Sequence, residues 1–356
     1  MPFKVLAINP GSTSTKIAVY EDGKPVFKDT LRHSAEELPP FKRITDQYDF
    51  RKKVIEDALS KAGINVEELN AIVGRGGLFK PIPSGTYQVN EEMKATVLES
   101  RYGEHASNLG CLIAADVARD AGCKAYIVDP VVVDEMNPLA RYSGLPEIPR
   151  RSILHALNQK AVARRAAQEL GKPYEQLNLI MVHLGGGISV GIHQQGWVTD
   201  VNNALNGDGP FAPERAGGLP TGDLVELCFS GKYTQKEIMK LLAGQGGCVS
   251  HLGTNDGREM ENRLKAGDAK TALIVEAMAY QVAKTIGEMA TVVKGSVDAI
   301  VLTGSFAYFK QFVDWVIERV SWMAPVRVYP GEDEMTALAE AGFRMLKGEE
   351  QAREYA

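Results

Sequence analysis

Two short turns in this chain carry residue types that bind phosphate. The first combines a glycine, an amide, several hydroxyls and one ammonium group within eight positions: Asn9, Gly11, Ser12, Thr13, Ser14 and Lys16. Backbone N–H groups in a tight glycine turn form a concave anion site, and hydroxyls add donors without bulk. A solvated hairpin rich in turn formers would have a similar composition. Taken alone, the turn therefore favours phosphate binding without deciding it.

The second turn contains three consecutive glycines, Gly185, Gly186 and Gly187, shortly after His183. Because glycine has no side chain, a ligand can approach this backbone closely. Three glycines in a row also cost conformational entropy that a plain connector would seldom incur. If the two turns face each other, they can grip one nucleoside triphosphate from both sides, so together they favour phosphoryl transfer.

The segments beside these turns predict a duplicated fold. Lys4–Asn9 and Lys16–Tyr20 flank the first turn with β-rich sequence, and Leu179–Leu184 and Ile188–Ile192 flank the second. A P-loop or dinucleotide-binding turn would lead into a helix, and neither glycine motif occurs in this chain. The repeated pattern predicts an α/β protein with two related domains, each with a mixed sheet, facing one another across a cleft. A coincidental pair of glycine-containing hairpins is the alternative.

Helical and strand-like patterns fill the remaining chain. Helices are predicted at Asp49–Ala62, Ala106–Ala121, Ser152–Leu170, Ala269–Val293 and Glu334–Lys347, and strands at Leu69–Val73, Ala125–Val128 and Ala299–Thr303. The last of these strands ends at Gly304 and Ser305, which would lie against the nucleoside, because ligands bind at the carboxyl ends of strands in such sheets. We place the domain boundary near residue 150, giving domains 1–150 and 151–334. The C-terminal helix, 335–356, is expected to pack back on the first domain.

The composition points to a small-molecule enzyme. The chain has 356 residues, 44% of them hydrophobic, and a net charge of −5. Neither a basic footprint for nucleic acid or anionic membrane nor a window of roughly 20 apolar residues is present. The four cysteines lack metal-type spacing, and Met1–Pro10 reads as a buried strand rather than a signal peptide. We therefore expect a soluble cytoplasmic protein with reduced thiols.

The order of these motifs resembles that of the acetate kinase family, within the superfamily of sugar kinases, actin and heat-shock ATPases. Asn9–Lys16 resembles its N-A-G-S-S-S-x-K turn, and His183–Ile188 its H-L-G-N-G-x turn. Gly253–Arg258 is similar to its S-x-D-x-R segment, and Asp298–Gly304 to its D-A-I-V-F-T-x-G strand. The resemblance covers nearly the whole chain. It implies two ribonuclease H-like domains around an ATP cleft, ATP and Mg²⁺ as cofactors, and at least a dimer.

The resemblance also implies roles for single residues. Arg75 looks like the family's arginine that contacts the carboxyl group and the transferring phosphoryl group. His155 stands where the family has a histidine that donates to the phosphoryl oxygens, and Asp129 where it has an active-site aspartate. Without the other motifs, these three residues would be read as a surface arginine, a helix histidine and a turn former before proline.

Further positions would bind the nucleotide and its metal. By the same resemblance, Asp256 and Arg258 flank the nucleotide. Glu334 or Glu332 looks like the carboxylate that holds Mg²⁺ through water, with Asn9 as the second metal-binding residue. Mg²⁺ keeps much of its hydration shell, so one or two such ligands plus the phosphates suffice. An acidic cluster at a helix N-terminus would also arise from dipole compensation alone.

Two departures from the family pattern suggest a sister branch of acetate kinases. Pro220 stands where the family has a second catalytic arginine, and Arg215, five residues earlier, is the candidate to replace it. Gly186 replaces the asparagine of the second turn.

Two further positions bear on the acid that is phosphorylated. Gly77 and Leu154 stand where acetate kinases place bulky valine and phenylalanine around the methyl group of acetate. Each extra buried methylene contributes about 0.8 kcal/mol. We therefore expect a preference for butyrate, or a branched acid such as isobutyrate, over acetate and propionate.

The predicted reaction is reversible in-line transfer from ATP to a carboxylate. A carboxylate is already an anionic nucleophile, so the site must align the groups and neutralise charge rather than supply a strong base. Two other classes stay open. One is a non-catalytic, actin-like ATP-binding switch, in which Arg75 and His155 would be idle. The other is a sugar kinase of the same superfamily, in which Asp129 would act as the base.

Overall fold

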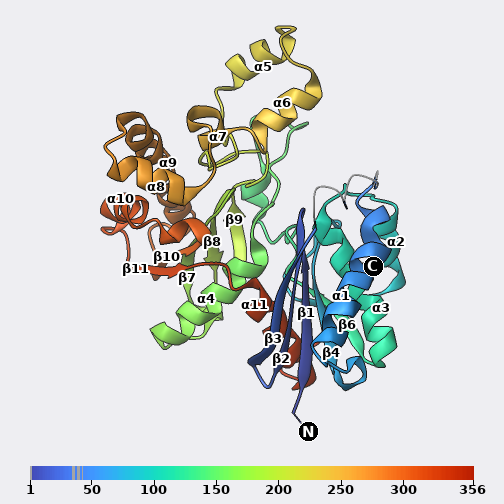
Figure 1. Ribbon diagram of the computed structural model, residues 1–356. Coiled ribbons are helices and arrows are strands. Elements are labelled where there is room, and N and C mark those ends of the chain that lie inside the picture. Colours follow the sequence, from blue (N-terminus) through green and yellow to red (C-terminus); the bar gives the residue numbers. More distant parts are fainter. Residues whose placement is uncertain (1, 34–36, 38–40, 42) are drawn as a thin grey trace. The chain divides into compact units, whose positions relative to one another are not determined.

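The computed structural model describes residues 2–33, 37, 41 and 43–356. The chain forms two compact units (Figure 1), each built on its own sheet. Unit 1 comprises Met1–Val133 and Asp333–Ala356, and unit 2 comprises Asp134–Glu332.

Unit 1 contains a mixed six-stranded sheet in the order β3-β2-β1-β4-β6-β5. Its strands are β1 (Lys4–Pro10), β2 (Ser14–Glu21), β3 (Lys24–Arg32), β4 (Ala71–Arg75), β5 (Thr86–Gln88) and β6 (Lys124–Val128). The first three strands form an antiparallel meander, and β1, β4 and β6 run parallel. The carboxyl ends of β1, β4 and β6 therefore reach the same edge of the sheet, which is where ligands bind in such folds.

Helices pack on both faces of this sheet. The α-helices of unit 1 are α1 (Tyr48–Lys61), α2 (Glu91–Leu98), α3 (Leu109–Ala121) and α11 (Glu334–Leu346). Helix α11 approaches one face closely, because Gly342 lies against Val5 and Val73. Helix α3 covers the other face, where Gly110 lies against Gly74. Successive residues of a strand point to opposite faces, so contacts at 73 and 74 place the two helices on opposite sides.

Unit 2 repeats this strand pattern. Its sheet has the order β11-β10-β7-β8-β9 and consists of β7 (Asn178–Leu184), β8 (Ile188–Gln194), β9 (Trp197–Val201), β10 (Ala299–Gly304) and β11 (Val326–Pro330). The antiparallel meander β7-β8-β9 corresponds to β1-β2-β3, and the parallel strands β10 and β11 correspond to β4 and β6. The predicted duplication is therefore confirmed.

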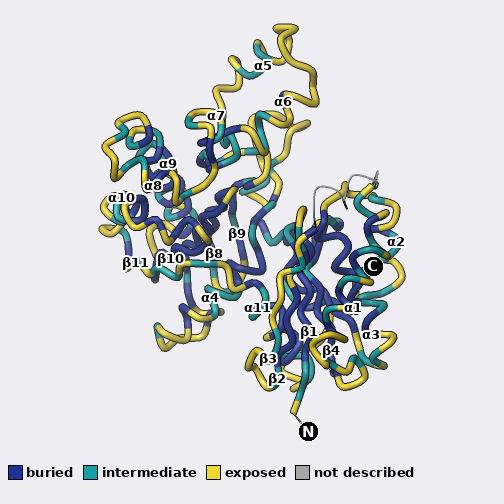
Figure 2. Tube along the Cα trace, viewed as in Figure 1, coloured by how far each residue is buried: buried dark blue, intermediate teal, exposed yellow. Residues whose placement is uncertain are grey.

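Helices cover both faces of the sheet in unit 2. The α-helices of this unit are α4 (Ala156–Leu170), α5 (Thr221–Phe229), α6 (Gln235–Leu242), α7 (Gly247–Leu252), α8 (Gly257–Lys265), α9 (Ala269–Val292) and α10 (Lys310–Val320). Alternation along the strands explains the two faces. Ile180 and Val182 pack in the cluster with α9 and α10, whereas Met181 and Val301 pack against α4. The central strands are accordingly buried (dark blue in Figure 2).

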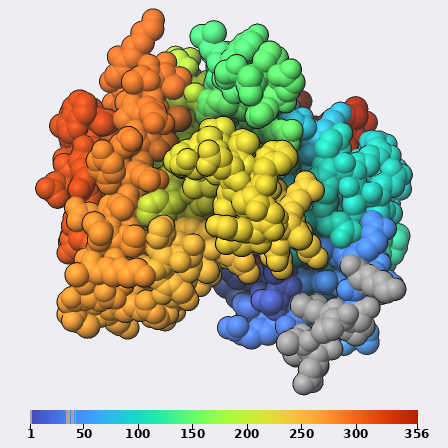
Figure 3. Space-filling model, turned by 90° about the horizontal axis from the view of Figure 1, so that it is seen from above, coloured from blue at the N-terminus to red at the C-terminus, as the bar shows by residue number. Residues whose placement is uncertain are grey.

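The remaining elements are short 3₁₀ helices and an exposed helical segment of unit 2. The 3₁₀ helices are η1 (Thr45–Gln47), η2 (Val66–Glu68), η3 (Ala106–Asn108), η4 (Pro138–Arg141), η5 (Tyr174–Gln176) and η6 (Ser305–Tyr308). Helices α5 and α6 form an excursion of unit 2 that is largely exposed, shown in yellow in Figure 3. In the part of the chain that is described, no helix has the length and apolar character needed to cross a membrane.

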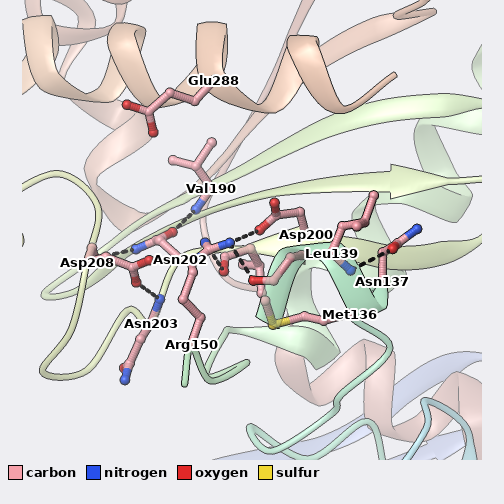
Figure 4. A network of polar contacts seen from close by, with 12 residues as sticks. Met136, Asn137, Leu139, Arg150, Val190, Asp200, Asn202, Asn203, Asp208 and Glu288 are labelled. Atoms are coloured by element: carbon pink, nitrogen blue, oxygen red, sulfur yellow. Dashed lines mark hydrogen bonds and ion pairs between the residues drawn. The ribbon is translucent and has the colours of Figure 1, made fainter. Parts of the chain in front are cut away.

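The division between the units differs from the predicted boundary at residue 150. Residues 134–150 belong to unit 2 because polar contacts tie them to it. Arg150 donates to Asp200 at 2.9 Å and to Asp208 at 3.0 Å (Figure 4). Glu135 accepts from Lys160 at 2.7 Å, and both side chains are 1% exposed. These partners lie 25 to 58 residues away along the chain, so local sequence patterns could not indicate them.

Candidate active site

The first predicted phosphate turn joins β1 to β2 at the carboxyl end of β1. The N–H of Gly11 donates to the carbonyl of Ser14 at 2.7 Å, which closes the turn. Ser12, Thr13 and Lys16 are exposed, so their donors are accessible to a ligand. Asn9 of the same predicted set is 5% exposed, so the exposed donors of this turn are those of Ser12, Thr13 and Lys16, and their role in binding phosphate stays a prediction.

A buried arginine that sequence reasoning missed holds this turn in shape. Arg51 of α1 is 0% exposed and donates to the carbonyls of Gly11 at 2.8 Å, Ser12 at 3.0 Å and Ser14 at 3.2 Å. It also donates to the hydroxyl of Thr15 and to Oε1 of Gln47. Burial lowers the pKa of this guanidinium to about 10, so it stays charged at neutral pH. Arg51 thus provides hydrogen-bond donors to three backbone carbonyls of the turn.

Three predicted residues meet at the sheet edge of unit 1. Arg75 ends β4, Asn9 lies near the end of β1, and Glu334 begins α11. Glu334 Oε2 accepts from Nδ2 of Asn9 at 2.6 Å and from Nη1 of Arg75 at 2.9 Å. The side chain of Glu334 is 8% exposed and that of Arg75 is 22% exposed. The arginine is therefore oriented by a buried carboxylate while part of its guanidinium stays accessible.

The donor set around Glu334 fits a hydrated Mg²⁺ better than a metal held mainly by protein. Among the described residues, no group of three or more His, Cys, Asp or Glu side chains could hold a metal ion. Glu334 and Asn9 supply one carboxylate and one amide, which suits an ion that keeps water and phosphate oxygens as its other ligands. The alternative carboxylate, Glu332, belongs to unit 2 and lies 3.2 Å from Nε2 of His183.

Asp129 has a clear structural role at the end of β6. It is 3% exposed, adopts a left-handed backbone with φ of 39°, and its Oδ1 accepts from the N–H of Gly85 at 2.8 Å. Such a backbone is uncommon for a residue with a side chain, and it persists where contacts hold it. Its assignment as a catalytic residue stays a prediction.

The space beside Gly77 is occupied in the structure. A Cβ at this position would lie 2.2 Å from Oδ1 of Asn108 and 2.6 Å from its Cα. Asn108 is 1% exposed, accepts from the N–H of Leu78 at 2.8 Å and donates to the carbonyl of Gly103 at 3.0 Å. The space left by the missing side chain is therefore filled by Asn108. Leu154, the other predicted pocket residue, is 2% exposed in unit 2.

The second predicted turn joins β7 to β8 and is packed by two neighbouring side chains. A Cβ on Gly186 would lie 2.8 Å from Oε1 of Glu214, and one on Gly187 would lie 1.9 Å from Nη1 of Arg215. Glu214 Oε2 also accepts from Asn255 at 3.0 Å. Arg215 donates to the carbonyl of Ala204, and burial lowers the pKa of its guanidinium. Arg215 thus lies at the turn, and its assignment as a catalytic residue stays a prediction.

Two histidines stack beside this turn. The rings of His155, which precedes α4, and His183, at the end of β7, lie 3.8 Å apart with an interplanar angle of 11°. Nδ1 of His183 is 2.8 Å from Oδ1 of Asn158, and Nδ1 of His155 is 2.9 Å from the hydroxyl of Ser189. The two rings are therefore held parallel by a partner on α4, Asn158, and a partner on β8, Ser189.

A cavity of about 540 Å³ is lined by several of the other residues that were predicted to bind the nucleotide. Its lining includes the predicted Gly185, Gly186, Asp256, Arg258 and Ser305. Sequence reasoning missed the other lining residues, which are Pro213, Asn255, Gly257, Glu261, Phe306, Tyr308 and Phe309. The volume falls within the range of roughly 300–1,000 Å³ typical of small-molecule pockets. Of the aromatic residues in the lining, Phe306 and Phe309 are 5% and 4% exposed, and Tyr308, at 70%, presents the most accessible ring.

Two predicted nucleotide residues support this pocket in other ways. Gly304 has φ of +96°, and a Cβ there would lie 2.2 Å from the carbonyl oxygen of Leu184, so glycine is required for β10 to approach β7. Asp256 caps α8 by accepting from the N–H of Arg258 at 2.8 Å. Its side chain is exposed and lines the cavity as well.

Comparison of this sequence with known proteins identifies the family to which the chain belongs. The acetokinase family model matches residues 147–322. The chain is 58% identical over 353 residues to butyrate kinase 1 of Clostridium acetobutylicum, covering 99% of both chains. It is 55% identical over 355 residues to butyrate kinase 2 of the same species, covering 100% of both. The chain belongs to the acetokinase family. The family resemblance seen in the motifs is confirmed.

Solved structures of this family share the fold. Acetate kinase from Porphyromonas gingivalis aligns with a TM-score of 0.76 at 20% identity, covering 97% of this chain and 100% of that one. Acetate kinase from Entamoeba histolytica aligns with a TM-score of 0.75 at 15% identity, covering 96% and 99%. The predicted fold class, two duplicated α/β domains with mixed sheets, is confirmed.

Proposed function

We propose that this chain is a cytoplasmic butyrate kinase, which transfers the γ-phosphoryl group of ATP to the carboxylate of butyrate and gives butyryl phosphate and ADP reversibly. The observation that carries the proposal is its similarity, over essentially the full length, to two butyrate kinases at 58% and 55% identity. The pocket at the glycine turn of unit 2 and the arginine at the sheet edge of unit 1 supply the matching chemistry.

Unit 2 binds the nucleotide in this proposal. The cavity lined by Ser305, Tyr308 and Phe309 takes the adenosine, and Gly186 and Gly187 present backbone N–H groups to the phosphates, while the N–H of Gly185 closes the turn on the carbonyl of Gly187. Arg215, which packs against Gly187, adds a fixed positive charge beside the turn. Positive charge and N–H donors stabilise the negative charge spread over the phosphoryl oxygens in the transition state.

Unit 1 binds the acid. Arg75 offers the carboxylate of butyrate a planar pair of N–H donors, and its ion pair with Glu334 fixes its orientation. The turn clamped by Arg51 donates to the phosphates. A carboxylate attacks without losing a proton, so neither unit has to supply a strong base.

Magnesium is expected to accompany the nucleotide. Glu334 and Asn9 would hold it, largely through water and phosphate oxygens. When bound, the ion supplies a concentrated positive charge that neutralises the phosphate oxygens. Glu334 also accepts from Arg75, so its carboxylate serves both the metal and the arginine in this proposal.

A substrate series tests the proposal directly. The purified protein is incubated with ATP, Mg²⁺ and hydroxylamine, which converts acyl phosphates to coloured hydroxamates. We expect the highest kcat/KM with butyrate or isobutyrate and lower values with propionate and acetate. Glycerol and glucose, whose phosphate esters do not react with hydroxylamine, are tested by release of ADP instead, and no turnover is expected with either. An acetate optimum would identify an acetate kinase, and phosphorylated sugar would identify a sugar kinase. ATP binding without any transfer would identify a nucleotide switch.

The proposed enzyme is at least a dimer, as the acetate kinase resemblance implies. Light scattering coupled to gel filtration measures this directly, and a mass of 38.7 kDa at assay concentration would indicate a monomer instead.

A further inference from the structure

A continuous line of buried polar groups leads from His155 into the interior of unit 2. Nδ1 of His155 lies 2.9 Å from the hydroxyl of Ser189, which lies 2.8 Å from Nε2 of Gln159. Oε1 of Gln159 lies 3.0 Å from Nε2 of His193, and Nδ1 of His193 lies 2.7 Å from the hydroxyl of Tyr174. Ser189, Gln159 and His193 are 0% exposed, and Tyr174 is 6% exposed. In such a network each partner dictates whether its neighbour donates or accepts.

The orientation of Gln159 is fixed by a backbone carbonyl. Its second contact is to the main-chain oxygen of Ser189 at 3.0 Å, and a carbonyl can only accept. The atom facing Ser189 must therefore be Nε2, whose two N–H groups go to the carbonyl and the hydroxyl of that residue. Oε1 then faces His193, so Nε2 of His193 carries a proton.

His193 is held as a neutral ring at the far end of the line. Burial, followed by the positive charges of Lys160 and Arg164, keeps its pKa well below the ordinary value of 6.5. With its single proton on Nε2, the ring accepts at Nδ1 from the hydroxyl of Tyr174. The tautomer of His193 thus agrees with the orientation of Gln159.

The other contacts of the Ser189 hydroxyl determine where its proton points. Its oxygen accepts from Nε2 of Gln159 at 2.8 Å and from the backbone N–H of His155 at 3.4 Å, which uses both lone pairs. Its own proton therefore points to Nδ1 of His155. A histidine that accepts at Nδ1 carries its proton on Nε2, since the hydrogen bond at one ring nitrogen sets the tautomer at the other.

We propose that Gln159 and Ser189 are positioning residues that hold His155 in the tautomer with its proton on Nε2. That N–H is then the donor offered to the phosphoryl group, a step that rests on the proposed function. The ring cannot turn freely, because it stacks on His183 at 3.8 Å. The charged group facing this stack is Glu332, 3.2 Å from Nε2 of His183, while Lys160 and its partner Glu135 lie toward His193.

Nitrogen NMR of the nucleotide-free protein tests the tautomer without any turnover. The chain has six histidines, so a sample labelled with ¹⁵N at histidine gives few signals, and the His155→Asn variant identifies the one of interest. We expect a proton on Nε2 and none on Nδ1. A proton on Nδ1 of His155 would overturn the proposal. The measurement does not depend on turnover or on the identity of the substrate.

Kinetics test the consequence. Ser189→Ala should populate both tautomers of His155 and lower kcat about 10- to 100-fold, with KM for ATP and butyrate within about threefold of wild type. Ser189→Thr, which keeps the hydroxyl, should recover most of kcat and the wild-type tautomer. Thr285→Val is the matched control, because it deletes a buried hydroxyl bonded to the carbonyl of Gln281, away from the network.

The two measurements separate the possible failures. A Ser189→Ala protein with wild-type kcat and an unchanged His155 signal would overturn the proposal. If the tautomer changes and kcat does not, the phosphoryl-donor role that the family resemblance implies for His155 fails, while the proposed butyrate kinase activity is untouched. A loss of kcat in Thr285→Val equal to that in Ser189→Ala would show a general packing effect and would also overturn the proposal.

Discussion

Replacing Arg51 with lysine should both destabilise the protein and weaken nucleotide binding. The guanidinium of Arg51 serves five acceptors, which are the carbonyls of Gly11, Ser12 and Ser14, the hydroxyl of Thr15 and the amide oxygen of Gln47. A lysine has three donors on one atom, so at least two acceptors lose their partner. Hydrogen bonds from a charged donor contribute about 1.5–3 kcal/mol each. We therefore expect Arg51→Lys to lower the free energy of unfolding by about 3–6 kcal/mol.

The effect on ATP follows from the same contacts. The carbonyls held by Arg51 belong to the turn whose N–H groups and hydroxyls are proposed to bind phosphate. If the loosened turn loses one such hydrogen bond, worth about 1.4 kcal/mol, the Kd for MgATP rises about tenfold. Urea unfolding at 25 °C measures the first effect, and isothermal titration calorimetry measures the second.

Arg119→Lys serves as the control for Arg51→Lys, and two separate results would refute the two expected effects. Arg119→Lys makes the same exchange at an arginine whose side chain is 66% exposed in unit 1, and it should change the unfolding free energy by less than about 0.5 kcal/mol. Wild-type stability of Arg51→Lys would refute the clamp. Reduced stability with an unchanged Kd for MgATP would refute the link between this turn and phosphate.

Three further predictions concern other parts of the molecule. Arg75→Ala should lower kcat/KM for butyrate by about 10³-fold in the hydroxamate assay, because it removes the proposed carboxylate donor; near wild-type turnover would exclude that role. Gly187→Ala should displace the guanidinium of Arg215, which lies 1.9 Å from the added Cβ, and lower kcat about 100-fold; an unchanged kcat would remove Arg215 from the catalytic set. The third prediction concerns pH. His193 has a lowered pKa when folded, so the unfolded chain binds more protons below pH 6.5, and stability falls as the pH drops from 6.5. The slope contributed by this group is up to about 1.4 kcal/mol per pH unit. Urea unfolding at pH 7.5 and 5.5 should show a smaller difference in His193→Gln than in wild type, and equal differences would contradict the assignment.

The sequence revealed those features whose signals are local. The glycine and hydroxyl turns sit between strand patterns, so both hairpins and their duplication could be predicted from 3.6- and 2-residue periodicity and turn chemistry. Helix α1 was also predicted to within one residue at each end. Nothing in that helix distinguished Arg51, because its partners are mostly backbone carbonyls 37 to 40 residues away. Three aromatic residues follow Gly304 and line the cavity, Phe306, Tyr308 and Phe309, and the sequence pattern alone did not single them out.

Two departures from the acetate kinase pattern have a common explanation that only the structure provides. Gly186 lacks the family's asparagine side chain, and the carboxylate of Glu214 occupies its place. Gly77 lacks the family's valine, and Asn108 occupies its place. In a closely packed protein a missing side chain seldom leaves a void, because the neighbouring residue closes in. Loss of bulk at one position is therefore weak evidence for a larger acid pocket. If the acid pocket is larger than in acetate kinases, the enlargement must come from elsewhere in the chain.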